Sequence, residues 1–126
     1  MNSISIIFTA ACLAIYLLLS MNAAMTRRRS GLAVGEKDNE TLARAVRAHG
    51  NFSEYTPLFL ISFVLLESVQ ASSNYLILVG LFFLLGRIFH AYSMFSKKEL
   101  FRALGMILTF GPYLANIINL LIVYFK

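Results

Sequence analysis

Long apolar runs separated by short polar segments are the feature that most constrains how this chain can fold. Four such runs lie at about residues 4–25, 41–68, 75–95 and 100–125. A helix needs about 20 predominantly apolar residues to cross the hydrocarbon core of a bilayer. Because each run has this length, we predict an all-α integral membrane protein built as a bundle of four transmembrane helices.

The composition supports a membrane protein with one domain. Hydrophobic residues make up 59% of the 126-residue chain and charged residues 13%, whereas soluble domains carry about 25% charged residues. This length is enough for a single domain, at residues 1–126. The net charge of +5 comes from few basic residues that lie between the apolar runs, so we expect no nucleic-acid partner. Cys12 is the only cysteine, which excludes an internal disulfide and favours an inert packing role.

The basic residues predict the orientation in the membrane. No Lys or Arg precedes the first apolar run, whereas Arg27 to Arg29 follow it, and this order does not fit a cleaved signal peptide. The third connection carries Lys97, Lys98 and Arg102, but the second, residues 67–74, has no basic residue. Because cytoplasmic loops are enriched in Lys and Arg, we expect the first and third connections in the cytoplasm and both termini away from it.

The second run is longer than a bilayer requires. It starts near Glu40 or Thr41, with Thr41 as the expected N-cap, and ends near Ser68. A helix of about 28 residues would be about 42 Å long, so its first turns should project into the cytoplasm. Pro57 removes one backbone hydrogen bond and should kink the helix about one turn earlier.

Polar residues of the second run fall on one face of the expected helix. Arg44, Arg47, Asn51 and Glu54 lie within about 80° of one another when each residue advances the helix by about 100°. His49 lies on the opposite side. A stripe of this kind on a membrane helix needs a polar environment, because lipid does not tolerate ionisable groups.

Ionisable residues from separate helices should therefore meet in one layer. Arg87 and His90 share a face near the end of the third expected helix, and Arg102 falls in the first turn of the fourth. These positions and the stripe of the second helix all belong to the cytoplasmic half. Ionisable groups in a span usually face a partner or a water-filled cavity. We therefore expect a positively charged pocket for an anionic small molecule, open to the cytoplasm.

Structural roles for the same residues stay open at this stage. Arg47 could form an ion pair with Glu54, and Arg87 could close a buried network with the same carboxylate. Asn51 could hydrogen-bond between helices, and His90 could be a helix-packing histidine. The convergence of several helices on one layer favours a binding site, because no single residue decides between the two interpretations.

The segment RAVRAHGNFSEYTPLFL, residues 44–60, resembles the signature of the MAPEG family, the membrane-associated proteins of eicosanoid and glutathione metabolism. The matching positions are Arg47, Asn51, Glu54, Tyr55 and residues 57–60. GRIFHAYSMF, residues 86–95, resembles the third-helix motif of the family, and Arg102 stands where the family places an arginine at the start of its fourth helix. The resemblance is to the leukotriene-C synthase and microsomal glutathione transferase branches, and the small size suggests the bacterial branch.

The resemblance implies a homotrimer in the bacterial inner membrane, with glutathione bound in the cytoplasmic half of the bundle. It implies a glutathione transferase or peroxidase, in which the thiolate attacks a lipophilic electrophile or a lipid hydroperoxide supplied by membrane lipid. Arg102 is the implied catalytic residue, since it would face the thiol. The implied glutathione-binding residues are Arg27 (or a neighbour among Arg27 to Arg29), Arg47, Asn51, Glu54, Tyr55, Arg87 and His90.

Two departures from the family pattern keep a non-catalytic alternative open. Met94 occupies a position where relatives often carry tyrosine, and Ala103 one where some carry serine. Both changes remove a hydroxyl that could donate to a thiolate, so a lipid- or glutathione-binding scaffold is the alternative. A four-helix multidrug exporter is disfavoured, because the first run has no carboxylate. A metal enzyme is disfavoured, because His49 and His90 have no second ligand one turn away.

Overall fold

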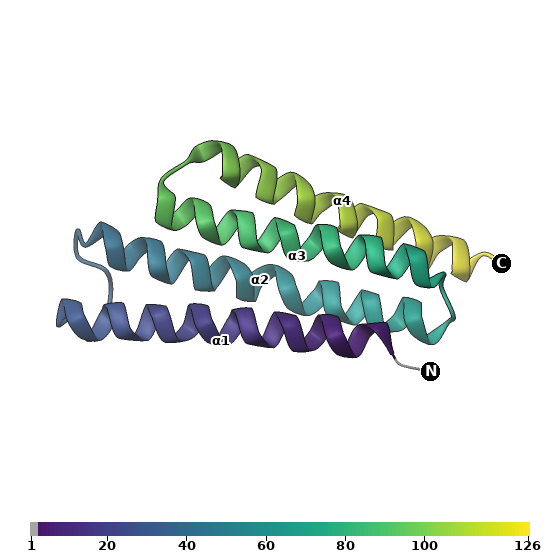
Figure 1. Ribbon diagram of the computed structural model, residues 1–126, viewed down its shortest axis with the longest axis horizontal. Helices are drawn as coiled ribbons and strands as arrows, with labels where there is room; N and C mark the ends of the chain where they lie inside the picture. Colours follow the sequence, from purple (N-terminus) through teal and green to yellow (C-terminus); the bar gives the residue numbers. More distant parts are fainter. Residues whose placement is uncertain (1–2) are drawn as a thin grey trace.

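Four antiparallel helices form the protein (Figure 1). The computed structural model describes residues 3–126, and the helices are α1 (Ile4–Ser30), α2 (Glu40–Ser68), α3 (Ser73–Ser96) and α4 (Glu99–Tyr124). The predicted all-α four-helix fold is confirmed. The α1–α2 and α3–α4 connections lie together at one end, which we call the arginine end (Figure 1). The start of α1 and the end of α4 lie with the α2–α3 connection at the other end.

The helices are arranged so that α2 and α3 separate α1 from α4. Within residues 3–126, α1 packs on α2 and α3, and α4 packs on α3 and α2, but α1 and α4 do not contact each other. The two outer helices therefore keep broad apolar surfaces. Only 17% of the most apolar stretch of α4 is buried within the subunit. So large an apolar surface is typical of a helix that faces lipid or another subunit.

Three helices, α1, α3 and α4, are long and apolar enough to cross a membrane. The sequence predicted four such helices, but α2 is not among them. Its 29 residues are long enough, and the charged and polar residues of its first half lower its hydropathy. Crossing of the membrane by α2 therefore stays a prediction.

Two helix ends differ from the sequence prediction. α1 continues beyond its apolar run through the three arginines to Ser30, and Gly31 then adopts a left-handed conformation with φ 70°, which is a common way to end a helix. The N-cap of α2 is Asn39 and not Thr41, because the Asn39 side chain accepts a hydrogen bond from the Leu42 N–H at 3.0 Å. Asn ranks above Thr at this position.

A carboxylate from α2 caps the start of α1. The Glu67 side chain accepts hydrogen bonds from the Ile4 N–H at 2.5 Å, from the Ser3 hydroxyl at 2.5 Å and from the Ser5 N–H at 3.2 Å. The first N–H groups of a helix lack partners within the helix, and a negative charge there interacts favourably with the helix dipole. This contact joins α1 to α2 at the end opposite the arginines.

Two glycines allow α3 and α4 to approach closely. A Cβ atom on Gly105 of α4 would lie 2.7 Å from the backbone nitrogen of His90 and 2.9 Å from the carbonyl oxygen of Gly86. A Cβ atom on Gly86 would lie 2.9 Å from the carbonyl oxygen of Gly105. These neighbours are backbone atoms, which cannot move without the whole helix. The close approach brings Arg87, which follows Gly86, within hydrogen-bond distance of the Thr109 side chain of α4.

We expect Gly105→Ala to destabilise the subunit by about 1–3 kcal/mol, because the added methyl group would force α3 and α4 apart. Thermal unfolding of the purified protein in detergent would measure the change. Gly111→Ala in the same helix is the matched control, since a Cβ there meets nothing within 4 Å. The control should be neutral, or stabilising by up to about 1 kcal/mol. Equal unfolding temperatures for the two variants would contradict the close approach.

Candidate functional site

A cavity of about 340 Å³ lies among α2, α3 and α4 in the half of the bundle nearest the arginine end. Its lining residues are Arg47, Asn51, Tyr55, His90, Met94, Arg102 and Met106. The three residues from α2 are spaced by four, so one face of that helix forms a wall. The volume is near the lower end of the range for small-molecule sites, about 300–1,000 Å³.

The cavity brings together most of the site residues that the sequence predicted. The predicted residues that line it are Arg47, Asn51, Tyr55, His90 and Arg102. Arg87 is buried directly behind Asn51. Glu54 is exposed and does not line the cavity, and Arg27 donates a hydrogen bond to the Gly35 carbonyl at 2.8 Å. Those two residues therefore lie outside the cavity.

The guanidinium of Arg87 is the buried centre of the site, with only 2% of the residue exposed. Its Nη1 donates to the Asn51 Oδ1 of α2 at 2.6 Å, and its Nε donates to the Thr109 hydroxyl of α4 at 3.0 Å. The Tyr55 ring lies 5.0 Å from the guanidinium carbon, which is within the range of a cation–π interaction. One side chain of α3 thus joins three helices.

The hydroxyl of Thr109 is oriented to accept from Arg87. Its own proton is donated to the Gly105 carbonyl one turn earlier in α4, at 2.7 Å. A hydroxyl has one proton and two lone pairs, so the oxygen is free to accept from both Nε and Nη2 of Arg87. The sequence analysis missed Thr109, although it lies seven residues after Arg102 and therefore on the same face of the helix.

The positive charge of Arg87 has no buried carboxylate partner in the described residues. The sequence left open a network between Arg87 and Glu54, but the observed partners are the neutral oxygens of Asn51 and Thr109. The alternative pair between Arg47 and Glu54 is also not formed, because their charged atoms are not within 4 Å within residues 3–126. The cavity is therefore lined by cations without a carboxylate among the lining residues.

Met94 and Ala103, the two positions that depart from the family pattern, lie in different places relative to the cavity. Met94 is buried and forms part of the cavity wall, to which it contributes a thioether and no hydroxyl. Tyr92 does not replace it, because its ring is exposed and packs edge-on against Phe101 at 5.0 Å. Ala103 is exposed and does not line the cavity. Tyr55 is the lining residue that carries a hydroxyl.

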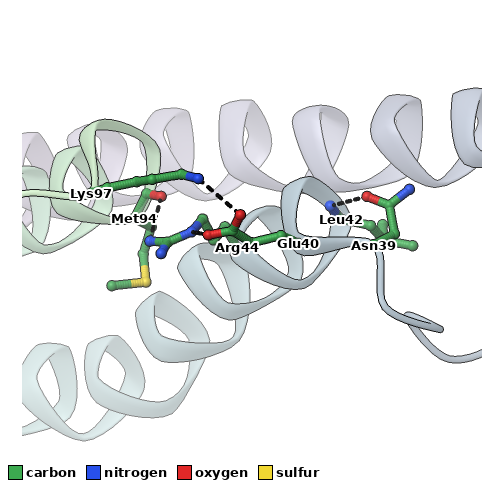
Figure 2. Close-up of polar contacts among 6 residues, drawn as sticks. All are labelled: Asn39, Glu40, Leu42, Arg44, Met94 and Lys97. Carbon is green, nitrogen blue, oxygen red and sulfur yellow. Dashed lines mark hydrogen bonds and ion pairs between the residues drawn. The ribbon is translucent and has the colours of Figure 1, made fainter.

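Ion pairs of Glu40 with Arg44 and Lys97, which we call the Glu40 clasp, join the start of α2 to the end of α3 (Figure 2). Glu40, at the start of α2, pairs with Arg44 of its own helix at 2.9 Å and with Lys97, after α3, at 2.8 Å. Arg44 also donates to the Met94 carbonyl at 3.3 Å. Because Met94 belongs to the cavity wall, the clasp holds that wall against α2. Helical periodicity did not predict the Glu40–Lys97 pair, since it joins residues far apart in sequence.

A second cavity of about 400 Å³ lies between α1 and α2. Most of its lining is apolar or aromatic, and it contains no Lys, Arg, Asp or Glu. Cys12 belongs to this wall and to the buried core. This second cavity therefore offers apolar contacts and no charged group to a ligand.

The fold and the site together define a multi-pass membrane protein with a positively charged cavity among its helices. The chain belongs to the MAPEG family, whose sequence model matches residues 5–122. This result confirms the resemblance that the helix motifs indicated.

The chain is also similar to the inner membrane protein YecN of Escherichia coli strain K12. The two sequences are 26% identical over 99 residues, which cover 79% of this chain and 76% of YecN. YecN of Escherichia coli O6:H1 strain CFT073 matches with the same identity and coverage. No solved structure matches the chain.

We expect Thr109→Val to destabilise the protein by about 1.5–3 kcal/mol, because it removes an acceptor from a buried charged group. Thr56→Val is the matched control, since the Thr56 hydroxyl is buried without a hydrogen-bond partner in the described residues. The control should be neutral or stabilising, because it removes an unsatisfied polar atom. Unfolding in detergent measures both, and an equal loss in the two variants would contradict the role of Thr109.

The Glu40 clasp predicts a pH dependence of stability. Hydrogen bonds from Lys97 and Arg44 hold the pKa of the Glu40 carboxyl below its ordinary value of 4.5. A carboxyl whose pKa is lowered on folding stabilises the folded state above its unfolded pKa, and this contribution is lost as pH falls through the folded pKa. The difference in stability between wild type and Glu40→Gln should therefore be largest near neutral pH and shrink below about pH 4.5.

The pH prediction is measured by unfolding midpoints across that range. Glu36→Gln is the control, because Glu36 is exposed and has no ion pair within residues 3–126. Its difference from wild type should be small at every pH. A Glu40→Gln difference that is constant with pH would show that the clasp does not depend on the charge of Glu40.

Proposed function

We propose that this protein binds glutathione in the arginine-lined cavity and acts as a glutathione transferase or peroxidase on lipophilic electrophiles or lipid hydroperoxides. The observation that carries the proposal is the charge of the cavity. Arg47 and Arg102 line it and Arg87 lies behind its wall, while no carboxylate is among the lining residues. An anionic ligand supplies the counter-charges that this arrangement lacks. Membership of the MAPEG family supports glutathione as that anion.

The chain's side chains suit the parts of glutathione, which is a small tripeptide with two carboxylates. Arg47 can bind a carboxylate through two parallel N–H donors, because the guanidinium fork matches that geometry. Asn51 is held in place by Arg87, so its remaining polar atoms present a fixed contact to the ligand. Tyr55, on the same α2 wall, and His90, on the α3 wall, can donate or accept hydrogen bonds.

Arg102 is the residue that we assign to thiolate stabilisation. It lies in the first turns of α4 and lines the cavity. A positive charge at about 4 Å, with an effective dielectric constant of about 20, stabilises a thiolate by up to about 4 kcal/mol, or about three pKa units. The Arg102 side chain is 54% exposed, so solvent screening reduces this ceiling. A shift of about one unit would still increase the thiolate fraction about tenfold.

The apolar outer helices support a membrane-borne second substrate. Much of α4 presents apolar side chains outside the subunit, and the cavity lies beside this helix. A lipophilic electrophile dissolved in the bilayer can therefore approach the thiolate laterally. We also propose that the site lies in the cytoplasmic half of a bacterial inner membrane, with both termini on the other side, because Arg27 to Arg29, Lys97 and Lys98 gather at the arginine end.

We also propose that the protein assembles as a homotrimer. Glu54 and Arg27 were predicted to bind glutathione, but both lie outside the cavity of one subunit. A neighbouring subunit that packs on the exposed faces of the outer helices would enclose the cavity and could bring one of these residues to it. Glu54 could then pair with the ammonium group of glutathione.

A non-catalytic binding scaffold is the second candidate function. Met94 favours it, because its thioether occupies a cavity wall where a hydroxyl would donate to the thiolate. A scaffold would bind glutathione or lipid and show no turnover with any electrophile. Turnover assays with electrophiles and lipid hydroperoxides therefore separate the two functions once binding is established.

The test of the proposed function is the ultraviolet absorbance of the glutathione thiolate, mixed with purified protein near neutral pH. We expect a thiolate band for the wild type and about a tenfold smaller thiolate fraction for Arg102→Ala, because the guanidinium lowers the thiol pKa. Lys98→Ala is the control, because Lys98 lies directly before α4 and does not line the cavity. The substitution removes a positive charge near Arg102 without changing the lining. The control should keep the band.

Three outcomes distinguish the possibilities. A band that is equal in the wild type and in Arg102→Ala would remove Arg102 from the catalytic role. Binding of glutathione without a thiolate band would favour the scaffold. No binding by a folded wild-type protein would reject glutathione as the ligand.

A further inference from the structure

Arg102 is the lining arginine that already has a carboxylate partner. Its Nη1 lies 3.2 Å from the Glu99 Oε2, one turn earlier in α4. Arg47, the other arginine of the lining, has no carboxylate within 4 Å in residues 3–126. A carboxylate outside the lining of the cavity is therefore paired with the cation that we assign to the thiolate.

The ion pair between Glu99 and Arg102 is exposed and therefore exchangeable. The side chain of Glu99 is 74% exposed, and neighbouring ion pairs on the surface of a helix contribute little free energy. An anion that enters the cavity meets Arg102 among its lining residues. Such a ligand can replace the Glu99 carboxylate at a small cost.

The displaced carboxylate has a second favourable position. Glu99 is the first residue of α4, and the N-cap Lys98 makes no side-chain hydrogen bond to the start of that helix. The first N–H groups of a helix lack partners within the helix and favour a negative charge. Glu99 can therefore release Arg102 and remain at the start of α4 without losing all of its electrostatic stabilisation.

We propose that Glu99 is a positioning residue that competes with the ligand anion for Arg102. In the free protein, Glu99 holds the guanidinium at the surface of the cavity. When the thiolate binds, the guanidinium exchanges one anion for the other and Glu99 moves to the start of α4. This inference rests on the proposed binding of glutathione, and no covalent step belongs to it.

Competition of this kind makes two physical predictions. Removal of the Glu99 charge should strengthen binding, because the ligand no longer has to displace a carboxylate. The effect should require Arg102, because Glu99 acts through that guanidinium alone. A structural role of Glu99 at the start of α4 would instead weaken folding and would not depend on Arg102.

The experiment measures the dissociation constant of glutathione by calorimetry for four full-length proteins in detergent. They are the wild type, Glu99→Gln, Arg102→Gln and the double variant. We expect Glu99→Gln to bind glutathione roughly two- to five-fold more tightly than wild type, the range that an exposed ion pair supports. In the Arg102→Gln background, the same substitution should give no tighter binding.

Glu36→Gln is the matched control for net charge. It removes one carboxylate from the exposed loop between α1 and α2, away from the lining residues, and should leave the dissociation constant unchanged. Unfolding temperatures of all variants would separate an effect on binding from an effect on folding.

The outcomes separate this inference from the proposed function. Tighter binding by Glu99→Gln that disappears without Arg102 supports the competition. Glutathione binding that is unchanged in Glu99→Gln, equally strengthened in Glu36→Gln, or strengthened also without Arg102 overturns the competition and leaves the proposed function intact. If neither wild type nor Glu99→Gln binds glutathione, both proposals fail.

Discussion

The buried guanidinium of Arg87 needs acceptors that its own helix cannot supply, and this need determines how α2, α3 and α4 meet. Asn51 and Thr109 provide those acceptors from the two neighbouring helices. A charged group buried without hydrogen bonds would cost several kcal/mol, so the three helices must keep the positions that satisfy it. The cavity lies directly beside this network, and its walls are consequently held by the same hydrogen bonds.

Close packing of α3 on α4 and ion pairs at the arginine end also hold the helices around the cavity. The glycines of α3 and α4 let the two backbones approach, which places the Thr109 hydroxyl within reach of Arg87. Nearer the arginine end, the Glu40 clasp holds the last turns of α3 against α2. Neutral oxygens satisfy the deeply buried Arg87, whereas the ion pairs within residues 3–126 involve the half-buried Arg44 and the exposed Lys97 and Arg102. Because no carboxylate is among the lining residues, Arg47 and Arg102 make the lining of the cavity positively charged.

Sequence reasoning predicted much of the site because helical periodicity places polar residues on known faces. Spacing placed the polar residues of α2 on one face and Arg87 with His90 on another, and the predicted topology put both faces in the same half of the bundle. Glu54 shows the limit of this method, because a residue at the edge of a stripe can face the cavity or the outside. Its position depends on the rotation of α2 against α3 and α4, which spacing within one helix does not contain. The partners of Arg87 were missed for the same reason.

The sequence by itself determined that the chain forms four helices, that long apolar runs make it a membrane protein, and that it carries the motifs of its family. These properties are local: they depend on composition and on the order of residues within each helix. Only the tertiary structure decided that neutral oxygens, and not Glu54, satisfy Arg87, and that Met94 belongs to the cavity wall while Tyr92 does not. Such choices depend on the distances between helices, because a hydrogen bond forms only when its two atoms come within about 3 Å.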